Sequence, residues 1–279
     1  MAEPNANMRR AWDGPDGDIW AASADQYETR GAGHRRLLLL AAGIVSGERV
    51  LDLGCGNGAS TIEAARMADP GEVVGIDLSA AMLANARLRS EAEGLTNVTF
   101  VHGDAQVHDF EPESYDVVLS NAGAMFFDDQ VAAFANLRRA LRPGGRIALM
   151  AWQRLEDNEW LMVLREALAM GRDLPEPQVG VPGPYGLADR DQVSALLSGT
   201  GFTDLEFDDV REQSMFGATI AEAYALIALD GPTRGLLEDL TETDKATALE
   251  HLRSVIAAHE TPSGVMFGSA SWLIQARRP

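Results

Sequence analysis

Glycines and a carboxylate follow the first of several short apolar runs in this chain, and their spacing is typical of a ligand-binding turn. Asp52, Gly54, Cys55 and Gly56 lie at the end of an apolar run that suits a buried strand. Glycine permits positive φ in a tight turn and lets the backbone approach a ligand closely. The helix expected after the turn directs its N-terminal amides toward the same ligand. Such a turn also occurs for structural reasons alone, so the residues around it decide whether a ligand-binding role is predicted.

Polar residues end the next three apolar runs as well. Asp77 ends the second run, Asp104 follows the third, and Asn121 follows the fourth. Because the carboxyl ends of parallel strands meet at one edge of a sheet, we expect these side chains to share a crevice with the glycine turn. An acidic residue after the second strand accepts hydrogen bonds from ribose hydroxyls. The pattern therefore predicts a ligand that contains a nucleoside.

A dinucleotide is the first alternative, since Gly54, Gly56 and Ala59 satisfy the pattern GxGxxA. Asp52, just before the turn, repels a pyrophosphate, whereas its carboxylate holds the turn and, directly or through water, a cationic amino group. Asp104 adds an acceptor suited to the amino group of adenine. A ligand with a sulfonium and an ammonium group and no phosphate fits this acidic lining better than NAD.

The segments around these residues alternate between strand-like and helix-like, which predicts βαβ units and a parallel sheet. Ser79 is the expected N-cap of one helix, and residues 1–30 are expected to form an irregular arm and then a short helix. A Pro/Gly-rich loop is expected at 172–188. Strands are expected at 49–53, 73–77, 98–102, 115–120, 146–152, 202–212 and 265–277, and helices at 31–44, 59–68, 79–93, 129–141, 189–199 and within 218–260.

Composition narrows the classes of partner and compartment. The net charge of −19 repels phosphate backbones and anionic membrane surfaces, so neither nucleic acid nor a membrane is an expected partner. The longest apolar run, from Leu37 to Val45, is far shorter than the roughly 20 residues of a membrane span. Residues 1–30 contain no apolar secretory segment, so a cytoplasmic protein is expected.

The histidines and the single cysteine form no pattern of metal ligands. Cys55 is the only cysteine, which excludes an internal disulfide and a zinc site built from several cysteines. The five histidines lack HExxH or close H-x-H spacing, so no metal site is predicted. For Cys55, a small residue packed in the turn is favoured over a reactive thiol.

Residues 45–152 resemble the class I S-adenosylmethionine-dependent methyltransferase superfamily, in particular its small-molecule branch, which includes the ubiquinone and menaquinone C-methyltransferases. The resemblance is carried by VLDLGCGNG (50–58), VVGIDLS (73–79), VTFVHGDA (98–105), YDVVLSNAGAMFF (115–127) and LRPGGRIALMAW (141–152). It implies an α/β fold, namely a Rossmann-like, seven-stranded, mostly parallel sheet with an antiparallel last strand, helices on both faces and a helical cap. It also implies S-adenosylmethionine as the cofactor and S-adenosylhomocysteine as the product.

The same resemblance implies which residues hold the cofactor. By position, the methionine part meets Gly54 and Gly56, the ribose meets Asp77, the adenine meets Leu78, Met82, Asp104 and Ala105, and the sulfonium and carboxylate end meets Asn121 and Ala122. Asp52 and Cys55 complete the turn of this site. The arm with Trp12, Trp20 and Tyr27 is expected to fold over the cofactor, with Tyr27 in contact with it. Hydrophobic anchoring of the arm is the alternative.

A single methyltransferase domain is expected over residues 1–279. Its parts are an N-terminal arm and helix at 1–45, a cofactor-binding core at 46–152, and cap elements with the last strands at 153–279. The resemblance implies that 265–277 is the antiparallel seventh strand, with 202–212 as its hairpin partner. The cap, at 153–201 and 213–264, contains a mixture of Met, Phe, Leu and Tyr, which suits an apolar or aromatic substrate.

The expected function is transfer of a methyl group from the cofactor to an O, N or C nucleophile of a small, apolar or aromatic metabolite. The alternative is a protein that keeps this fold but has a cyclase-like or binding role. No catalytic base is assigned, because His34, His108, Tyr27 and Asp128 each have a structural role as the alternative to a catalytic one. The acceptor and the oligomeric state are not encoded in these patterns.

Overall fold

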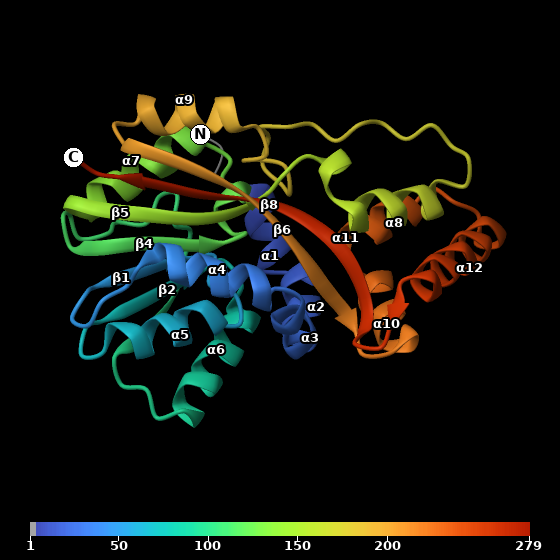
Figure 1. Ribbon diagram of the computed structural model, residues 1–279, viewed down its shortest axis with the longest axis horizontal. Coiled ribbons are helices and arrows are strands. Elements are labelled where there is room, and N and C mark those ends of the chain that lie inside the picture. The colour runs from blue at the N-terminus through green and yellow to red at the C-terminus, as the bar shows by residue number, and fades with distance from the viewer. Residues whose placement is uncertain (1–3) are drawn as a thin grey trace.

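One twisted sheet runs through the computed structural model, which describes residues 4–279 (Figure 1). In these residues the strand order is β3-β2-β1-β4-β5-β8-β6, and the short β7 pairs with β8. Strands β1 to β5 pair in parallel, and β8 lies antiparallel between β5 and β6. The bounds are β1 Val50–Leu53, β2 Val73–Asp77, β3 Val98–His102, β4 Tyr115–Asn121, β5 Leu141–Trp152, β6 Thr203–Gly217, β7 Glu260–Thr261 and β8 Gly264–Arg277. The predicted Rossmann-like sheet with an antiparallel last strand is confirmed.

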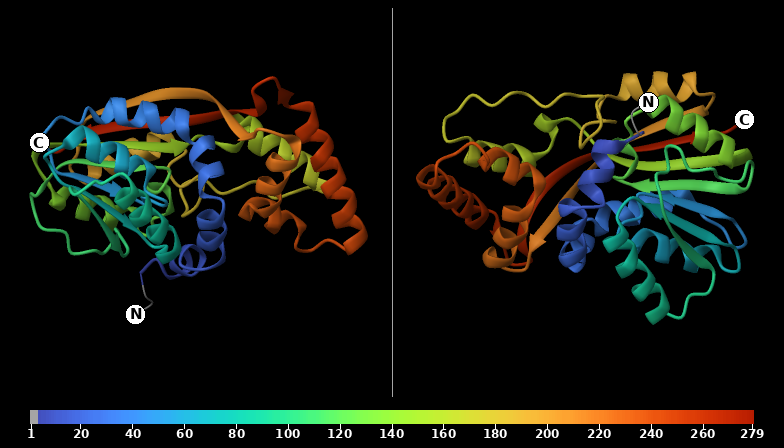
Figure 2. Two further views of the ribbon diagram at one scale, coloured as in Figure 1. Left: turned by 90° about the horizontal axis from the view of Figure 1, so that it is seen from below. Right: turned by 180° about the vertical axis from the view of Figure 1, so that it is seen from behind.

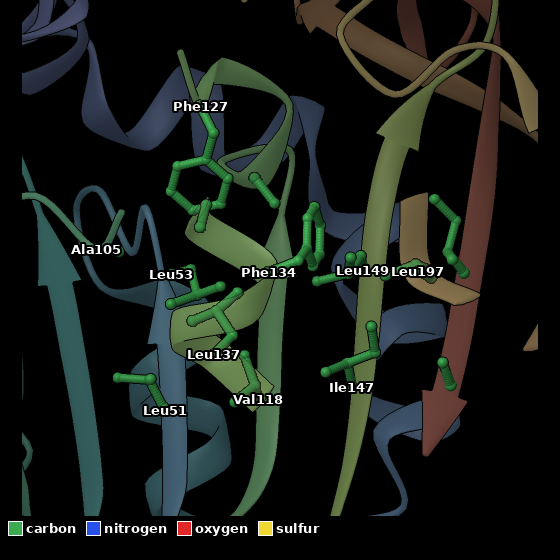
Figure 3. Close-up of a cluster of buried hydrophobic side chains, with 14 of the residues drawn as sticks. Leu51, Leu53, Ala105, Val118, Phe127, Phe134, Leu137, Ile147, Leu149 and Leu197 are labelled. Atoms are coloured by element: carbon green, nitrogen blue, oxygen red, sulfur yellow. The ribbon is translucent and has the colours of Figure 1, made fainter. Parts of the chain in front are cut away.

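Helices cover both faces of the parallel part of the sheet, so β1 and β4 at its centre are buried on both sides. One face carries α4 (Ala32–Ala42) and α5 (Ala59–Ala68), which pack on Val50 and Val117. The other carries α7 (Gln130–Ala140) and α9 (Arg190–Gly199). Figure 3 shows Phe134 and Leu137 of α7 over Leu51, Leu53 and Val118, the residues that alternate with those of the first face. Helix α6 (Ala80–Ala92) follows β2, and Ser79 caps it by accepting a hydrogen bond from the amide of Met82, as predicted.

The N-terminal segment is helical over most of its described length, so the prediction of an irregular arm was wrong. Within residues 4–30, the short helices are α1 (Ala6–Trp12), α2 (Pro15–Ala22) and α3 (Ala24–Arg30). Helices of this length are not stable alone in water and depend on tertiary contacts. Here Asp13 accepts a hydrogen bond from the amide of Ala80, and Asn85 donates one to the carbonyl of Ala21. Residues 1–3 of the predicted arm lie outside the described residues.

Strands β6 and β8 are longer than predicted and extend beyond the rest of the sheet to carry the cap. Strand β8 pairs with β5 only from Ser271 to Arg277, whereas its pairing with β6 continues to Val265 opposite Gly217. The cap helices pack around this extension, at the right of Figure 1. They are α8 (Glu159–Ala169), α10 (Ile220–Leu229), α11 (Gly231–Leu237) and α12 (Glu242–Ala258). Their core explains the extra length, because Phe216 and Phe267 at the far end of the strand pair are buried in it.

Two further features complete the fold. Strand β5 begins at Leu141, directly after α7, and its ladder with β4 is interrupted before it resumes at Arg146, which is where the strand was predicted to begin. The loop at 172–188 contains neither helix nor strand, as expected. Between residues 4 and 279, no helix combines the length and apolar character that crossing a membrane requires.

Candidate active site

A cavity of about 490 Å³ opens at the carboxyl ends of the parallel strands. Its wall includes Leu53 at the end of β1, Asp77 at the end of β2, Asn121 at the end of β4 and Ala151 in β5. The N-terminal helices lie between this edge of the sheet and the cap, and both contribute residues to the wall (Figures 1 and 2). The volume is within the range of sites for small organic ligands.

The turn after β1 requires glycine. Gly54, Gly56 and Gly58 have φ values of 62°, 53° and 89°, which side chains with a Cβ rarely adopt. A Cβ on Gly54 would also lie 2.8 Å from the Cα of Gly123, so the two backbones approach too closely for any other residue. Both Gly54 and Gly56 line the cavity, where their backbone is open to a ligand.

Asp77 joins the first two strand ends. Its buried carboxylate accepts hydrogen bonds from the amides of Gly56 and Ser79, both at 2.8 Å. Burial raises the pKa of this carboxyl, and the two amides oppose that rise. A carboxylate has about four lone-pair sites, so the side chain retains capacity for hydroxyl donors from a ligand.

Asp104 has an acceptor that the protein leaves unused. Its Oδ1 accepts hydrogen bonds from the amide of Gln106 at 2.9 Å and from Asn5 Nδ2 at 3.4 Å. Its Oδ2 is buried and has no hydrogen-bond partner among residues 4–279. A buried acceptor without a donor is costly, so a ligand with an N–H group at this end of the cavity fits. Asn5 belongs to the segment predicted to be irregular, and no pattern in the sequence indicated its role.

Asp52 lies behind the glycine turn and does not line the cavity, which corrects its expected direct contact with the cofactor. Its Oδ2 accepts hydrogen bonds from Ser60 Oγ at 2.7 Å and Thr61 Oγ1 at 2.6 Å, so it ties β1 to the first turn of α5. Asp52 points to the same face of β1 as Val50, and α5 covers that face. Burial, reinforced by the charges of Asp77 and Glu28, raises the pKa of Asp52 to about 7.

The structure brings the other predicted cofactor residues together around the cavity. These are Tyr27, Gly54, Cys55, Gly56, Asp77, Leu78, Met82, Asp104, Ala105, Asn121 and Ala122. Cys55 is buried, and its burial raises the pKa of the thiol well above the usual value. A thiol in this state is unreactive, in agreement with the predicted packing role.

The aromatic residues of the N-terminal segment form one wall of the cavity. The rings of Trp20 and Tyr27 stack at 3.8 Å between centroids, and Trp12 meets Trp20 edge-on at 5.7 Å. The hydroxyl of Tyr27 donates a hydrogen bond to Asp230, which follows cap helix α10. Arg30 pairs with the same Asp230 at 3.2 Å. The segment is therefore bound to the cap, and both predicted functions of these aromatics, covering the cavity and anchoring the segment, are compatible with their positions.

Of the four candidate bases, His34 and Tyr27 line the cavity. Burial, assisted by the charge of Arg30, lowers the pKa of His34 to about 4, so its ring is neutral near pH 7. Its Nε2 lies 3.3 Å from Ser269 Oγ. His108 lies outside the cavity, packed on Phe110. Asp128 is exposed and also lies outside it.

The N-terminus of α7 is capped by the neighbour of Asp128 and not by Asp128 itself. Asp129 caps α7 by accepting a hydrogen bond from the amide of Ala132 at 2.9 Å. Among the described residues, no group of three or more His, Cys, Asp or Glu side chains is arranged to hold a metal ion.

Several cavity residues were not predicted at all. Glu28, Arg30, Trp160, Asp230 and Ser271 come from α3, α8, the end of α10 and β8. No local spacing joins segments this far apart in the chain, so no sequence pattern identified them.

Comparison with known proteins finds that the chain is similar to methyltransferases. Residues 50–145 match the family model described as a methyltransferase domain. The aklanonic acid methyltransferase DauC of Streptomyces sp. (strain C5) is 40% identical over 105 residues, which are 37% of this chain and 48% of that protein. The O-methyltransferase rstn1 of Aspergillus nomiae is 29% identical over 217 residues, 74% of this chain and 84% of that protein. Residues 50–145 therefore match a methyltransferase domain, and both of these relatives are methyltransferases.

The fold of the protein agrees with this similarity. The structure of phosphoethanolamine N-methyltransferase 2 of Haemonchus contortus in complex with S-adenosyl-L-methionine has a TM-score of 0.62 and 22% identity, and the match covers 100% of this chain and 60% of that one. At this identity the likeness concerns the fold. The chain spans about half the length of most of the curated relatives it matches, for example 48% of the demethylmenaquinone methyltransferase of Staphylococcus aureus.

Proposed function

We propose that this protein transfers the methyl group of S-adenosylmethionine to an O, N or C nucleophile of a small, apolar or aromatic metabolite of secondary metabolism. The observation that carries the proposal is the composition of the cavity wall. One end has the glycine turn, Asp77 and Asp104, whereas the other has the indole rings of Trp152 and Trp160. A cationic cofactor and an apolar acceptor therefore each find a suitable environment in one cavity.

The cofactor end fits S-adenosylmethionine by the chemistry of its donors and acceptors. We propose that Asp77 accepts hydrogen bonds from the ribose hydroxyls and that the free Oδ2 of Asp104 accepts one from the adenine amino group. Leu78, Met82 and Ala105 would pack on the adenine. The two carboxylates also offset the positive charges of the sulfonium and ammonium groups.

The methionine part is proposed to lie along the glycine turn. Gly54 and Gly56 offer backbone without side chains, and Asn121 and Ala122 lie across the cavity after β4. When bound, the cofactor supplies a methyl group on a positively charged sulfur. The protein contributes alignment and exclusion of water, and the aromatic wall of Trp20 and Tyr27 serves the second purpose.

The net charge and the cysteine content support our proposals for the class of methyl acceptor and for the compartment. A net charge of −19 disfavours nucleic acid as the acceptor. The single cysteine is free and buried, in keeping with a reducing compartment, so we propose the cytoplasm.

The proposed function is tested by measuring methyl transfer to candidate acceptors. The purified protein is incubated with S-adenosylmethionine and a panel of phenols, amines and enolisable ketones, and S-adenosylhomocysteine is quantified. We expect release of S-adenosylhomocysteine that depends on acceptor and is absent in Asp77→Ala. Tight cofactor binding without transfer to any acceptor would favour the cyclase-like or binding alternative. Preferential binding of NAD over S-adenosylhomocysteine in calorimetry would refute the assigned cofactor.

A further inference from the structure

The cavity extends beyond the cofactor end, toward β5 and β8. In the ladder between these strands, Trp152 pairs with Ser271, and both residues line the cavity. Trp160 of α8 joins them, with its ring 5.8 Å from that of Trp152. His34 completes the group, since its ring meets Trp152 edge-on at 5.1 Å. We call these four residues the β5–β8 subsite. It lies across strands β4 and β1 from Asp77 and β2, on the acceptor side of the glycine turn.

The β5–β8 subsite has no net charge to offer a ligand. Its charged neighbours in the wall, Arg30 and Asp230, pair with each other at 3.2 Å, and burial keeps His34 neutral. Elsewhere in the wall, Asp16 pairs with Arg234 and Glu28 with Arg35. Among the described residues, the carboxylates of the wall without a basic side chain as ion-pair partner are therefore Asp77 and Asp104, at the cofactor end. A charged acceptor would be buried here without a counter-ion, which is costly.

Two polar groups of the β5–β8 subsite have no hydrogen-bond partner among the described residues. Trp160 is 6% exposed and Ser271 is 1% exposed. The indole Nε1 of Trp160 and the Oγ of Ser271 are buried, and neither has a hydrogen-bond partner among residues 4–279. Buried polar groups are normally paired. An indole N–H only donates, and a serine hydroxyl donates or accepts, so the missing partner of Trp160 is an acceptor atom.

The remaining surface of the subsite is aromatic. The indole of Trp152 and the neutral imidazole of His34 flank it, and the guanidinium of Arg30 covers one face of the Trp160 ring at 4.3 Å. Such walls favour planar rings in offset or edge-on contact. The positive Arg30 also withdraws electron density from the ring it covers, which polarises the indole N–H as a donor.

Resting on the proposed function, we propose that the β5–β8 subsite binds the methyl acceptor and selects a neutral, planar aromatic molecule that carries a carbonyl oxygen. Trp160 Nε1 donates a hydrogen bond to that oxygen, and Ser271 Oγ donates a second one to the same atom or to an adjacent oxygen. Trp152 and His34 pack on the aromatic rings. The carbonyl oxygen of the ligand determines which methyl acceptors bind, because a molecule without it would leave Trp160 Nε1 and Ser271 Oγ buried and unpaired.

The test measures binding without turnover, on the full-length protein saturated with S-adenosylhomocysteine and also on the protein alone. The probes are 6-acetyl-2-naphthol, 6-ethyl-2-naphthol and 6-hydroxy-2-naphthoate, which share shape and differ in a neutral carbonyl, no carbonyl and a carboxylate. Their affinities are obtained from naphthol fluorescence. We expect the acetyl compound to bind at least about tenfold more tightly than the ethyl compound, as one or two hydrogen bonds require, and the carboxylate to bind most weakly.

Three variants and two controls locate the preference. Trp160→Phe and Ser271→Ala should each reduce the preference for the acetyl compound, and the double variant should bring it close to onefold with unchanged affinity for S-adenosylhomocysteine. The matched controls are Trp272→Phe and Ser214→Ala, since Trp272 donates to the carbonyl of Ala188 and Ser214 contacts Ser269, both outside the cavity wall. Both controls should keep the full preference.

The two proposals fail in different ways. Equal binding of the acetyl and ethyl compounds, tightest binding of the carboxylate, or a preference that survives in the double variant would overturn the acceptor class while S-adenosylhomocysteine still binds. Failure to bind S-adenosylhomocysteine would overturn the proposed function instead, and the probes titrated into the protein alone would still decide the subsite.

Discussion

Replacing Asp230 by leucine leaves the guanidinium of Arg30 buried without its counter-ion. The two side chains are 9% and 8% exposed and 3.2 Å apart, and Asp230 also accepts the hydrogen bond of the Tyr27 hydroxyl. Removing one partner of a buried ion pair costs about 3–5 kcal/mol, because the remaining charge is neither solvated nor paired. The loss of the acceptor of Tyr27 adds to that cost. Asp230→Leu is therefore expected to destabilise the protein by at least about 3 kcal/mol.

The assay is thermal unfolding with and without S-adenosylhomocysteine. A domain of this size loses roughly 2–4 °C in Tm per kcal/mol, so Asp230→Leu should unfold about 10 °C below the wild type. Since Tyr27 and Trp20 lose their connection to the cap, affinity for S-adenosylhomocysteine should also fall. Asp239→Leu is the matched control, because Asp239 is an exposed carboxylate just after α11 of the same cap.

A second variant tests the physical cause. In Arg30→Met/Asp230→Leu no buried charge remains, and apolar replacements of buried pairs are often neutral, so most of the lost stability should return. Arg30 also stacks on Trp160 and Phe216 at 4.3 and 4.4 Å, contacts that methionine partly retains. An Asp230→Leu variant as stable as Asp239→Leu, or a double variant no more stable than Asp230→Leu, would refute the reasoning.

Three further perturbations test the cofactor end and His34. Asp104→Ala should weaken S-adenosylhomocysteine binding about 10- to 100-fold, because it removes a hydrogen bond to a charged group. Binding of S-inosylhomocysteine, which lacks the amino group, should be unaffected. Equal losses of affinity for both ligands in calorimetry would contradict the role of Asp104 at the adenine. Asp77→Ala should weaken binding of S-adenosylhomocysteine at least about 100-fold through two ribose hydrogen bonds, and an affinity within threefold of the wild type would exclude that role. Burial lowers the pKa of His34 from 6.5 to about 4, so between these values the unfolded chain binds a proton that the folded protein does not, and stability falls with falling pH by up to roughly 3 kcal/mol. His34→Gln should lose this component in urea unfolding at pH 7 and pH 4.5. The raised pKa of Asp52 changes stability in the opposite direction, but Asp52 is present in both the wild type and His34→Gln. An identical pH dependence of stability in these two proteins would therefore disprove the lowered pKa of His34.

The sequence by itself determined the order of the strands and helices along the chain and most of the cofactor end. Each glycine or carboxylate there, such as Gly54, Asp77 and Asp104, directly follows its own apolar run. Parallel pairing then brings all strand ends to one edge, so local spacing is enough to place them together. The antiparallel last strand was predicted from the family resemblance, and the position of β8 between β5 and β6 confirms it.

Only the sheet showed to which face of a strand each side chain points. Asp52 was expected at the ligand, but side chains of β1 alternate between faces, and the face of Asp52 is covered by α5. Only the positions of Ser60 and Thr61 on that helix show that its carboxylate is used within the protein.

The tertiary structure alone decided the closure of the cavity and its acceptor end. Helices α1 to α3 are too short to be stable without the body of the protein, so their pattern could not predict them. Arg30 pairs with Asp230, and Trp160 and Ser271 line the same cavity, although the members of each pair lie far apart in the chain. No periodicity encodes such contacts, because they depend on how β6 and β8 extend past β5 and carry the cap over the strand ends.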